Sequence, residues 1–394
     1  MSVHRSAAAA SAASGRSRRP TPPRWSAARR ARAPRASASA TSSAASTPPR
    51  PEARMAERRI ALGALARVEG EGSVRLRIGP EGVRSVDLRI FEAPRFFEGI
   101  LRGRAATEAP EITARICGIC PVAYVLTASL AVERAWGIGV GDDIRALRRL
   151  LYCGEWIQSH VVHVAMMHAP DFLGLPDAAA MARERPDLLR DALRLRGVGM
   201  AVIEAVGGRA VHPVNTRVGG FFRAPPTERI GALAPELDWA VGAAERLTAA
   251  FAEFDFPDQE EDYLFVSLGH PAEYPILDGR IVSSEGLDIA QSDFRTHFVE
   301  RQVDRSTALH GLTRDGRPYL VGPLARYAIN APKLSPRARA AAAAAGLGPV
   351  VRNPHRAILV RMVETIHACE EASHLARGYV PPEPAAAPAP RRGG

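Results

Sequence analysis

Two cysteines separated by two residues, in the run Arg115-Ile116-Cys117-Gly118-Ile119-Cys120-Pro121, constrain this chain more than any other feature. Proline favours the first position of a helix, so we expect Cys120 at the cap of a helix that runs to about Trp136. The unpaired N–H groups and the positive dipole end at a helix start favour thiolate over thiol, and thiolate is the form that binds metal. By spacing alone, the pair fits a metal site, a redox pair or two core cysteines equally well.

The net charge of +10 does not by itself indicate a nucleic-acid-binding protein. Residues 1–54 contain eleven of the 52 basic residues and one of the 42 acidic residues, so this leader accounts for the whole charge. Its Ala, Ser, Arg and Pro cannot bury a core, and we expect a disordered leader that need not be native. The alternative is a basic arm that binds nucleic acid. We expect the folded domain to start at Met55, with no nucleic-acid partner.

Cysteine usage and hydropathy bear on the compartment. The chain has four cysteines and no signal peptide, which indicates a reducing environment rather than a disulfide framework. No apolar run approaches the roughly 18 residues that a membrane-spanning helix needs. We therefore expect a cytoplasmic protein without a membrane span.

Hydrophobic periodicity predicts a mainly helical domain with small β additions over residues 55–380, followed by a Pro/Ala/Arg/Gly tail over residues 381–394. The expected elements are a hairpin of residues 74–78 and 83–91, a short helix at 94–102, a long helix capped by Asp142 or Asp143, further helices at about 186–205, 226–253, 287–300 and 335–346, and a last helix opened by Asn353-Pro354.

Several short motifs recur in a fixed order along residues 60–385, and together they resemble the large (alpha) subunit of nickel–iron hydrogenases. The resemblance is greatest to the cytoplasmic group that couples to NAD(P) or similar soluble carriers. The motifs are Arg67-Val68-Glu69-Gly70, Phe97-Glu98-Gly99-Ile100-Leu101-Arg102-Gly103-Arg104, the cysteine loop, Ser159-His160-Val161-Val162-His163, His168-Ala169-Pro170-Asp171-Phe172, Gly208-Arg209-Ala210-Val211-His212-Pro213, Asn353-Pro354 and His367-Ala368-Cys369-Glu370-Glu371.

The resemblance implies a role for four residues. Cys117 and Cys120 correspond to one thiolate that binds nickel alone and one that bridges nickel and iron, and soft thiolates suit such metals. Glu69 corresponds to the proton carrier near nickel, the alternative being a solvated carboxylate paired with Arg67. Glu98 corresponds to a ligand of a structural magnesium, the alternative being a surface pair with Arg102.

Other metal-binding residue types have simpler interpretations. His160 and His163 lie three residues apart on the expected long helix, and we interpret them as packing or hydrogen-bonding groups rather than ligands. Cys153 and Cys369 are most simply core residues on helix faces. If the chain instead binds zinc, either of these cysteines could join the CxxC pair.

The resemblance also implies a part of the family fold that the printed sequence does not contain. Large subunits of this family continue for more than a hundred residues beyond the helix that matches 353–378, and a second CxxC there supplies the other two metal thiolates. We therefore expect an incomplete large-subunit fold, truncated before its C-terminal CxxC. A chain with two of the four thiolates is expected to be inactive alone.

The function implied by the resemblance is reversible oxidation of H2 to protons and electrons at a nickel–iron centre. Expected partners are a small subunit carrying iron–sulfur clusters and diaphorase-type subunits that reduce NAD(P). Two alternatives stay open at this point. One is a non-catalytic structural or assembly subunit related to hydrogenases, and the other is a quinone-site subunit related to the respiratory NADH–quinone oxidoreductase.

Overall fold

The computed structural model describes residues 57–66, 68, 70–92 and 95–388. Contacts divide the chain into two units, Met1–Arg54 and Met55–Gly394, and the elements below belong to the second. The α-helices in these ranges are α1 (Phe96–Leu101), α2 (Ala109–Thr113), α3 (Pro121–Trp136), α4 (Asp142–Val161), α5 (Ala169–Phe172), α6 (Ala178–Glu184), α7 (Pro186–Gly207), α8 (Thr227–Gly231), α9 (Ala234–Ala252), α10 (Phe294–His297), α11 (Pro323–Asn330), α12 (Pro336–Ala344) and α13 (Ala357–Arg377).

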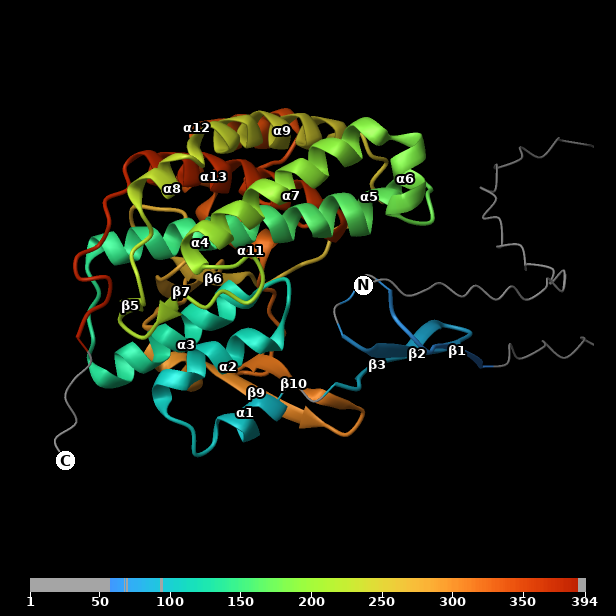
Figure 1. Ribbon diagram of the computed structural model, residues 1–394. Coiled ribbons are helices and arrows are strands. Elements are labelled where there is room, and N and C mark those ends of the chain that lie inside the picture. The colour runs from blue at the N-terminus through green and yellow to red at the C-terminus, as the bar shows by residue number, and fades with distance from the viewer. Residues whose placement is uncertain (1–56, 67, 69, 93–94, 389–394) are drawn as a thin grey trace, which may run out of the picture. The chain divides into compact units, whose positions relative to one another are not determined.

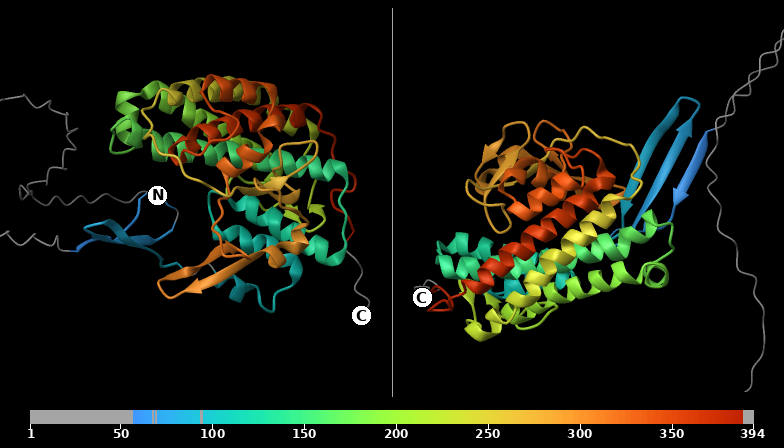
Figure 2. Two further views of the ribbon diagram at one scale, coloured as in Figure 1. Left: turned by 180° about the vertical axis from the view of Figure 1, so that it is seen from behind. Right: turned by 90° about the horizontal axis from the view of Figure 1, so that it is seen from above.

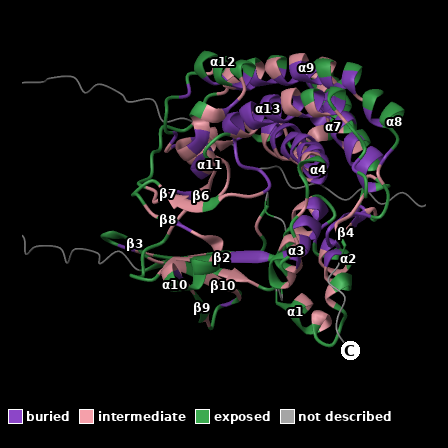
Figure 3. Ribbon diagram, turned by 90° about the vertical axis from the view of Figure 1, so that its left-hand side faces the viewer, coloured by how far each residue is buried: buried purple, intermediate pink, exposed green. Residues whose placement is uncertain are grey.

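Four long helices form the core. Helix α4 packs against α7 and α13, and α9 packs against α13 and α7, so the four lie side by side (Figures 1 and 2). Helix α13 is buried on most of its surface, whereas α12 and α1 expose much of theirs (Figure 3). A helix that is buried nearly all round belongs inside a protein, and α13 therefore forms the centre of the core.

A buried ion pair joins α3 to α4. Arg148 is fully buried and donates to both carboxylate oxygens of Glu133, which is 3% exposed. The same carboxylate accepts the N–H of Gly219 at 2.6 Å. Helix α3 closes at Gly137, whose φ of 66° is the left-handed conformation that glycine tolerates best. The helix that follows the cysteines is thus fixed to the core.

The sheets are small and antiparallel. They comprise β1 (Arg58–Leu62), β2 (Gly72–Gly79) and β3 (Gly82–Ile90) in the order β1-β2-β3; β4 (Thr216–Arg217) with β5 (Gly220–Phe221); β6 (Val266–Gly269), β7 (Arg280–Ser283) and β8 (Asp288–Ile289) in the order β6-β7-β8; and β9 (Phe298–Val303) with β10 (Ser306–Thr313). The register of the first sheet pairs Leu76 with Val86 and with Ile60, which places these apolar side chains on one face.

Much of the predicted secondary structure is confirmed. The expected hairpin is β2–β3, and the helix after the cysteines covers Pro121–Trp136. The expectations for 94–102, 186–205 and 335–346 correspond to α1, α7 and α12. Asn353 does open the last helical segment, because its side chain accepts the N–H of His355 before α13 begins.

Three expectations about elements were wrong. Residues 226–253 form two helices, α8 and α9, and Pro235 near the start of α9 lacks the N–H that a continuous helix would use. Residues 287–300 are not one helix: strand β8, a 3-10 turn, the four-residue helix α10 and the start of β9 occupy them. Gly141, not an aspartate, caps α4, and Asp142 and Asp143 lie in its first turn.

The described part of the tail pairs with the core. The N–H of Phe221 donates to the carbonyl of Ala385 at 2.9 Å, and the N–H of Ala387 donates to Gly219 at 2.8 Å. Gly220 has a φ of 149°, and a Cβ there would lie 2.4 Å from the Ala385 carbonyl oxygen, so only glycine allows this close approach. Within the described ranges, no helix has the length and hydropathy needed to cross a membrane.

Candidate functional site

The two cysteines of the CxxC motif flank a tight loop ahead of α3. Cys117 has an extended backbone and is 6% exposed, and Cys120 is the N-cap residue of α3 and is partly exposed. The backbone N–H groups of Ile119 and Cys120 both donate to the sulfur of Cys117, at 3.3 and 3.2 Å. Hydrogen bonds from N–H groups favour the anionic form of an acceptor, so the loop supports a thiolate at Cys117.

The start of α3 differs from the expectation of unpaired N–H groups. Glu155, on α4, accepts the N–H of Val122 at 2.6 Å and that of Ala123 at 2.9 Å. Burial raises the pKa of Glu155 to about 8, although the two N–H donors act in the opposite direction. The first turn of α3 is therefore capped by a carboxyl group from a neighbouring helix. Sequence reasoning missed this residue.

A second residue of α4 holds the loop from its other side. The amide nitrogen of Gln158 donates to the carbonyl of Ile119, one of the two residues between the cysteines. Gln158 is 7% exposed and lies three residues after Glu155, which places the two side chains on one face of the helix. The loop and the first turn of α3 are thus both attached to α4.

A buried polar cluster lies on the helices behind this loop. The carboxylate of Glu364, fully buried on α13, accepts two hydrogen bonds of 2.7 Å from Arg326 and one of 2.7 Å from the Tyr274 hydroxyl. His160 lies 3.0 Å from the same carboxylate. Burial opposes ionisation of Glu364, but the charge and hydrogen bonds of Arg326 outweigh it and hold its pKa well below the usual range.

Tyr152 lies near both this cluster and the cysteine loop, and charged groups of both act on its hydroxyl. Burial and the negative charges of Glu155 and Cys120 raise the pKa of Tyr152, while Arg326 opposes them. The guanidinium of Arg326 also lies 4.6 Å from the ring centre of Trp156. Loop and cluster are therefore neighbouring parts of one polar region.

The two histidines of the long helix behave as packing and hydrogen-bonding groups, as expected. His160 contacts Glu364, and His163 stacks on His168 with ring centres 4.2 Å apart. His163 and His168 belong to a π-helical turn, Val162–His168, that extends α4. Cys153 and Cys369 are both fully buried core residues, as expected.

Of the two carboxylates predicted to have a role, the structure describes Glu98 but not Glu69. Glu69 lies outside the described residues. Glu98 lies on α1 at the surface, and both of its oxygens accept 2.8 Å hydrogen bonds from Arg95. The guanidinium of Arg95 lowers the pKa of Glu98. The surface pair is thus made with Arg95 rather than with Arg102, and a magnesium role for Glu98 stays a prediction.

One group of acidic and histidine side chains outside the motifs has ligand-like spacing. In the described ranges, His270, Glu273 and Asp278 bring one donor atom each within 4.8 Å of one another. The guanidinium of Arg145 forms ion pairs with the carboxylates of Glu273 and Asp278. A guanidinium nitrogen of Arg149 lies 2.7 Å from a carboxylate oxygen of Glu273. Because the arginines already balance both carboxylates, the group is an ion-pair network rather than a cation site.

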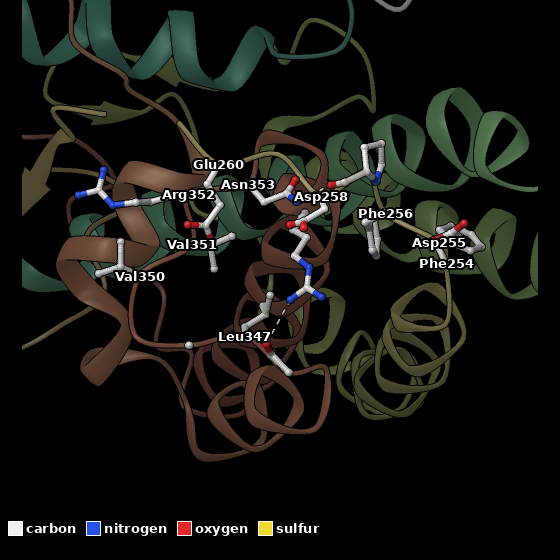
Figure 4. Close-up of a pocket in the computed structure, with 14 residues that line it drawn as sticks. Phe254, Asp255, Phe256, Asp258, Glu260, Leu347, Val350, Val351, Arg352 and Asn353 are labelled. Carbon is white, nitrogen blue, oxygen red and sulfur yellow. Dashed lines mark hydrogen bonds between the residues drawn. The ribbon is translucent and has the colours of Figure 1, made fainter. Parts of the chain in front are cut away.

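One cavity lies elsewhere in the described part of the chain. It has a volume of about 590 Å³ and is formed by the segment after α9 and the loop before α13, with Phe256, Asp258, Arg352 and Asn353 among its lining residues (Figure 4). Neither cysteine lines it. The cavity and the cysteine loop are therefore separate features of the structure.

The residues at the loop fit a soft metal. Cys117 and Cys120 offer two sulfur donors, and the N–H groups around Cys117 stabilise the anionic state that ligation needs. Two thiolates make up part of a coordination sphere, so the described residues supply one side of such a centre.

Sequence comparison identifies hydrogenases as relatives. Residues 95–225 match the family described as nickel-dependent hydrogenase. The chain is 35% identical over 283 residues to the alpha subunit of sulfhydrogenase 1 of Pyrococcus furiosus, covering 71% of this chain and 66% of that protein. It is 30% identical over 291 residues to a vhu-type F420-non-reducing hydrogenase chain of Methanocaldococcus jannaschii, covering 68% of this chain and 69% of that protein.

Structural comparison leads to the same group of proteins. The crystal structure of an NAD+-reducing NiFe hydrogenase in the H2-reduced state matches with a TM-score of 0.73 and 26% identity, covering 84% of this chain and 81% of that one.

This chain spans only part of its sequence relatives. The sequence alignments cover 66% and 63% of the alpha subunits of sulfhydrogenases 1 and 2 of P. furiosus, less than two thirds of their length.

Proposed function

The chain belongs to the nickel-dependent hydrogenase large-subunit family, a family of oxidoreductases with a nickel–iron centre, and from this premise we propose that it forms part of a hydrogenase that oxidises H2 reversibly to protons and electrons. The observation that carries the proposal is the loop in which Cys117 accepts two backbone N–H bonds beside Cys120. By their resemblance to the family's motif, we assign these cysteines to its first metal-binding pair.

The chain's residues would divide the chemistry between them. A bound nickel–iron centre would supply heterolytic cleavage of H2, and soft thiolates suit the redox-active metals of such a centre. The sulfurs of Cys117 and Cys120 would hold the centre on the side of α3. Glu69 would take the released proton on a carboxylate oxygen and pass it towards solvent. Glu98 would bind a magnesium ion only by exchanging its two hydrogen bonds with Arg95 for the ion.

The partners follow from the fate of the electrons. Each H2 yields two protons and two electrons, and the electrons need an acceptor beyond the proposed centre. We propose that an iron–sulfur small subunit receives them and that diaphorase-type subunits pass them to NAD(P). The structural match to an NAD+-reducing hydrogenase supports this assignment. It also supports a cytoplasmic location, where NAD(P) is the common soluble carrier.

Glu69→Gln tests the proton role in the assembled hydrogenase, in which the small subunit is present together with a second cysteine pair. Glutamine keeps the size of glutamate but cannot carry a proton. H2 turnover and H/D exchange should fall by about 100-fold or more while the infrared bands of the metal ligands persist. Glu71→Gln, at an exposed carboxylate two residues away, is the matched control and should leave both rates unchanged.

Cys117→Ser and Cys120→Ser test the ligand role in the same assembly. Each should abolish nickel incorporation, measured by elemental analysis, because serine is a poor ligand for a soft metal.

Each of the two tests has an outcome that would contradict the proposal. Retention of full exchange activity in Glu69→Gln would mean that the proton leaves by another route. Retention of nickel in both serine variants would refute the metal assignment.

A further inference from the structure

Glu155 is placed to act on the cysteine loop without touching a metal. It is 2% exposed, and its two carboxylate oxygens each accept one N–H from the first turn of α3. Since two separate donors are satisfied by two separate oxygens, the carboxylate fixes both the position and the rotation of the helix start. Cys120 is the N-cap residue of that helix.

Gln158 fixes the other side of the same loop. Its amide donates to Ile119, which lies between the two cysteines, so α4 attaches to the chain on both sides of Cys120. The backbone N–H of Cys120 in turn donates to the Cys117 sulfur. A displacement of the helix start would therefore change the relation between the two sulfurs.

Helix α4 is itself held tightly at this point. A Cβ added to Gly199 of α7 would lie 2.7 Å from the backbone nitrogen of Gln158 and 2.7 Å from the carbonyl oxygen of Gly154. Helices that approach this closely leave little freedom for sliding. The face of α4 that carries Glu155 and Gln158 is thus a rigid base for the loop.

We propose that Glu155 and Gln158 are positioning residues that set the spacing and orientation of the Cys117 and Cys120 sulfurs for metal ligation. The proposal rests on the proposed function, because it assumes that this pair binds metal. It extends that function to residues outside the cysteine motif. Removing a group that orients the ligand residues typically changes metal affinity by about 10- to 100-fold.

Cobalt(II) binding to the full chain tests the proposal, with the thiolate-to-cobalt charge-transfer band as the readout at about pH 8.5. Glu155→Gln keeps the volume but offers one acceptor oxygen, and its NH2 group faces an N–H. We expect cobalt affinity to fall about 10- to 100-fold and the band to shift. Gln158→Leu, which removes only the donor to Ile119, should act in the same direction and remains informative if Glu155→Gln fails to fold.

Asp177→Asn is the matched control. Asp177 caps α6, where its carboxylate accepts the N–H of Ala180 at 2.8 Å. It should leave cobalt affinity unchanged even if it lowers stability. Cys117→Ser should abolish the band in every background. If both Glu155→Gln and Gln158→Leu bind cobalt like the wild type, the positioning role is refuted. If the wild type shows no thiolate band, the metal function itself fails.

Discussion

Arg326 and Glu364 form two parallel hydrogen bonds of 2.7 Å in the helical core, between α11 and α13. Glu364 is fully buried, and the Arg326 side chain is 21% exposed. Tyr274 and His160 occupy further positions around the carboxylate. The pair is thus the centre of a satisfied polar network beside the cysteine loop, and its loss should affect the whole core.

Glu364→Gln should destabilise the protein strongly. The substitution leaves the Arg326 guanidinium without its carboxylate, and breaking a buried pair in this way costs about 3–5 kcal/mol. The measurement is the free energy of unfolding in urea, followed by circular dichroism. Glu245→Gln, which breaks an exposed pair with Arg337, is the control and should cost about 0–1 kcal/mol. Equal losses in the two variants would contradict the buried-pair argument.

The half-buried His163 should make the protein sensitive to mild acid. Burial, together with Arg361, His168 and His160, lowers the pKa of His163 to about 3. Below about pH 6.5 the unfolded chain therefore binds a proton that the folded chain does not, so stability falls as the pH drops from 6.5 towards 3. The contribution of one such group is at most about 1.4 kcal/mol per pH unit, and solvent around the partly exposed ring reduces it.

The comparison with His163→Gln isolates this contribution. His160, whose pKa is also lowered, likewise reduces stability as the pH falls. Glu155, whose pKa is raised, has the opposite effect and increases stability as the pH falls from about 8 to 4.5. Both are unchanged in the variant, so they cancel in the difference. The slope of unfolding free energy between about pH 6.5 and 5 should be shallower in His163→Gln. The exposed His374→Gln is the control, and an identical slope in all three proteins would refute the assignment.

Local signals in the sequence were sufficient for the cysteine loop and for most helices. Alternation of apolar and polar residues predicted β2 and β3, and Pro121 marked the start of α3. The same signals failed where tertiary pairing decided the structure. Residues 298–300 were assigned to a helix but belong to β9, which pairs with β10, a partner that helical periodicity does not reveal.

The residues around the cysteines show the same limit. Glu155 lies four residues after Leu151, on the apolar face of α4. A carboxylate on such a face is almost never buried without a partner, so this position could have been predicted to hold a paired group. Its partners at Val122 and Ala123 are more than 30 residues away in sequence, so the hydrogen bonds themselves were not predictable. Arg326 and Tyr274 join Glu364 only through tertiary packing.

Deleting residues 1–54 should leave the thermal unfolding temperature nearly unchanged. This prediction rests on composition, because a segment of Ala, Ser, Arg and Pro has little apolar surface to bury. The deletion should also move the isoelectric point from about 10.1 towards neutrality, since the leader accounts for the whole net charge. Differential scanning fluorimetry and isoelectric focusing measure the two effects. A marked drop in unfolding temperature would show that the leader belongs to the folded domain.

Gly199→Ala should destabilise the protein and weaken metal binding together. A Cβ at this position would meet the backbone of Gln158 and Gly154 at 2.7 Å, and backbone atoms cannot move aside as a flexible side chain can. Overpacking of this kind costs about 1–3 kcal/mol. The shift would be transmitted to the cysteine loop, because Gln158 holds Ile119.

Gly242→Ala provides the contrast within another core helix. A Cβ there would meet only the Arg246 side chain at 3.6 Å, so alanine should be neutral or stabilising by about 0.5–1 kcal/mol through its better helix propensity. Urea unfolding and cobalt titration on both variants separate the two arguments. If Gly199→Ala lowers stability but leaves the thiolate-to-cobalt band and affinity unchanged, α4 does not determine the geometry of the cysteine pair. If it is as stable as Gly242→Ala, the close contact between α4 and α7 is wrong.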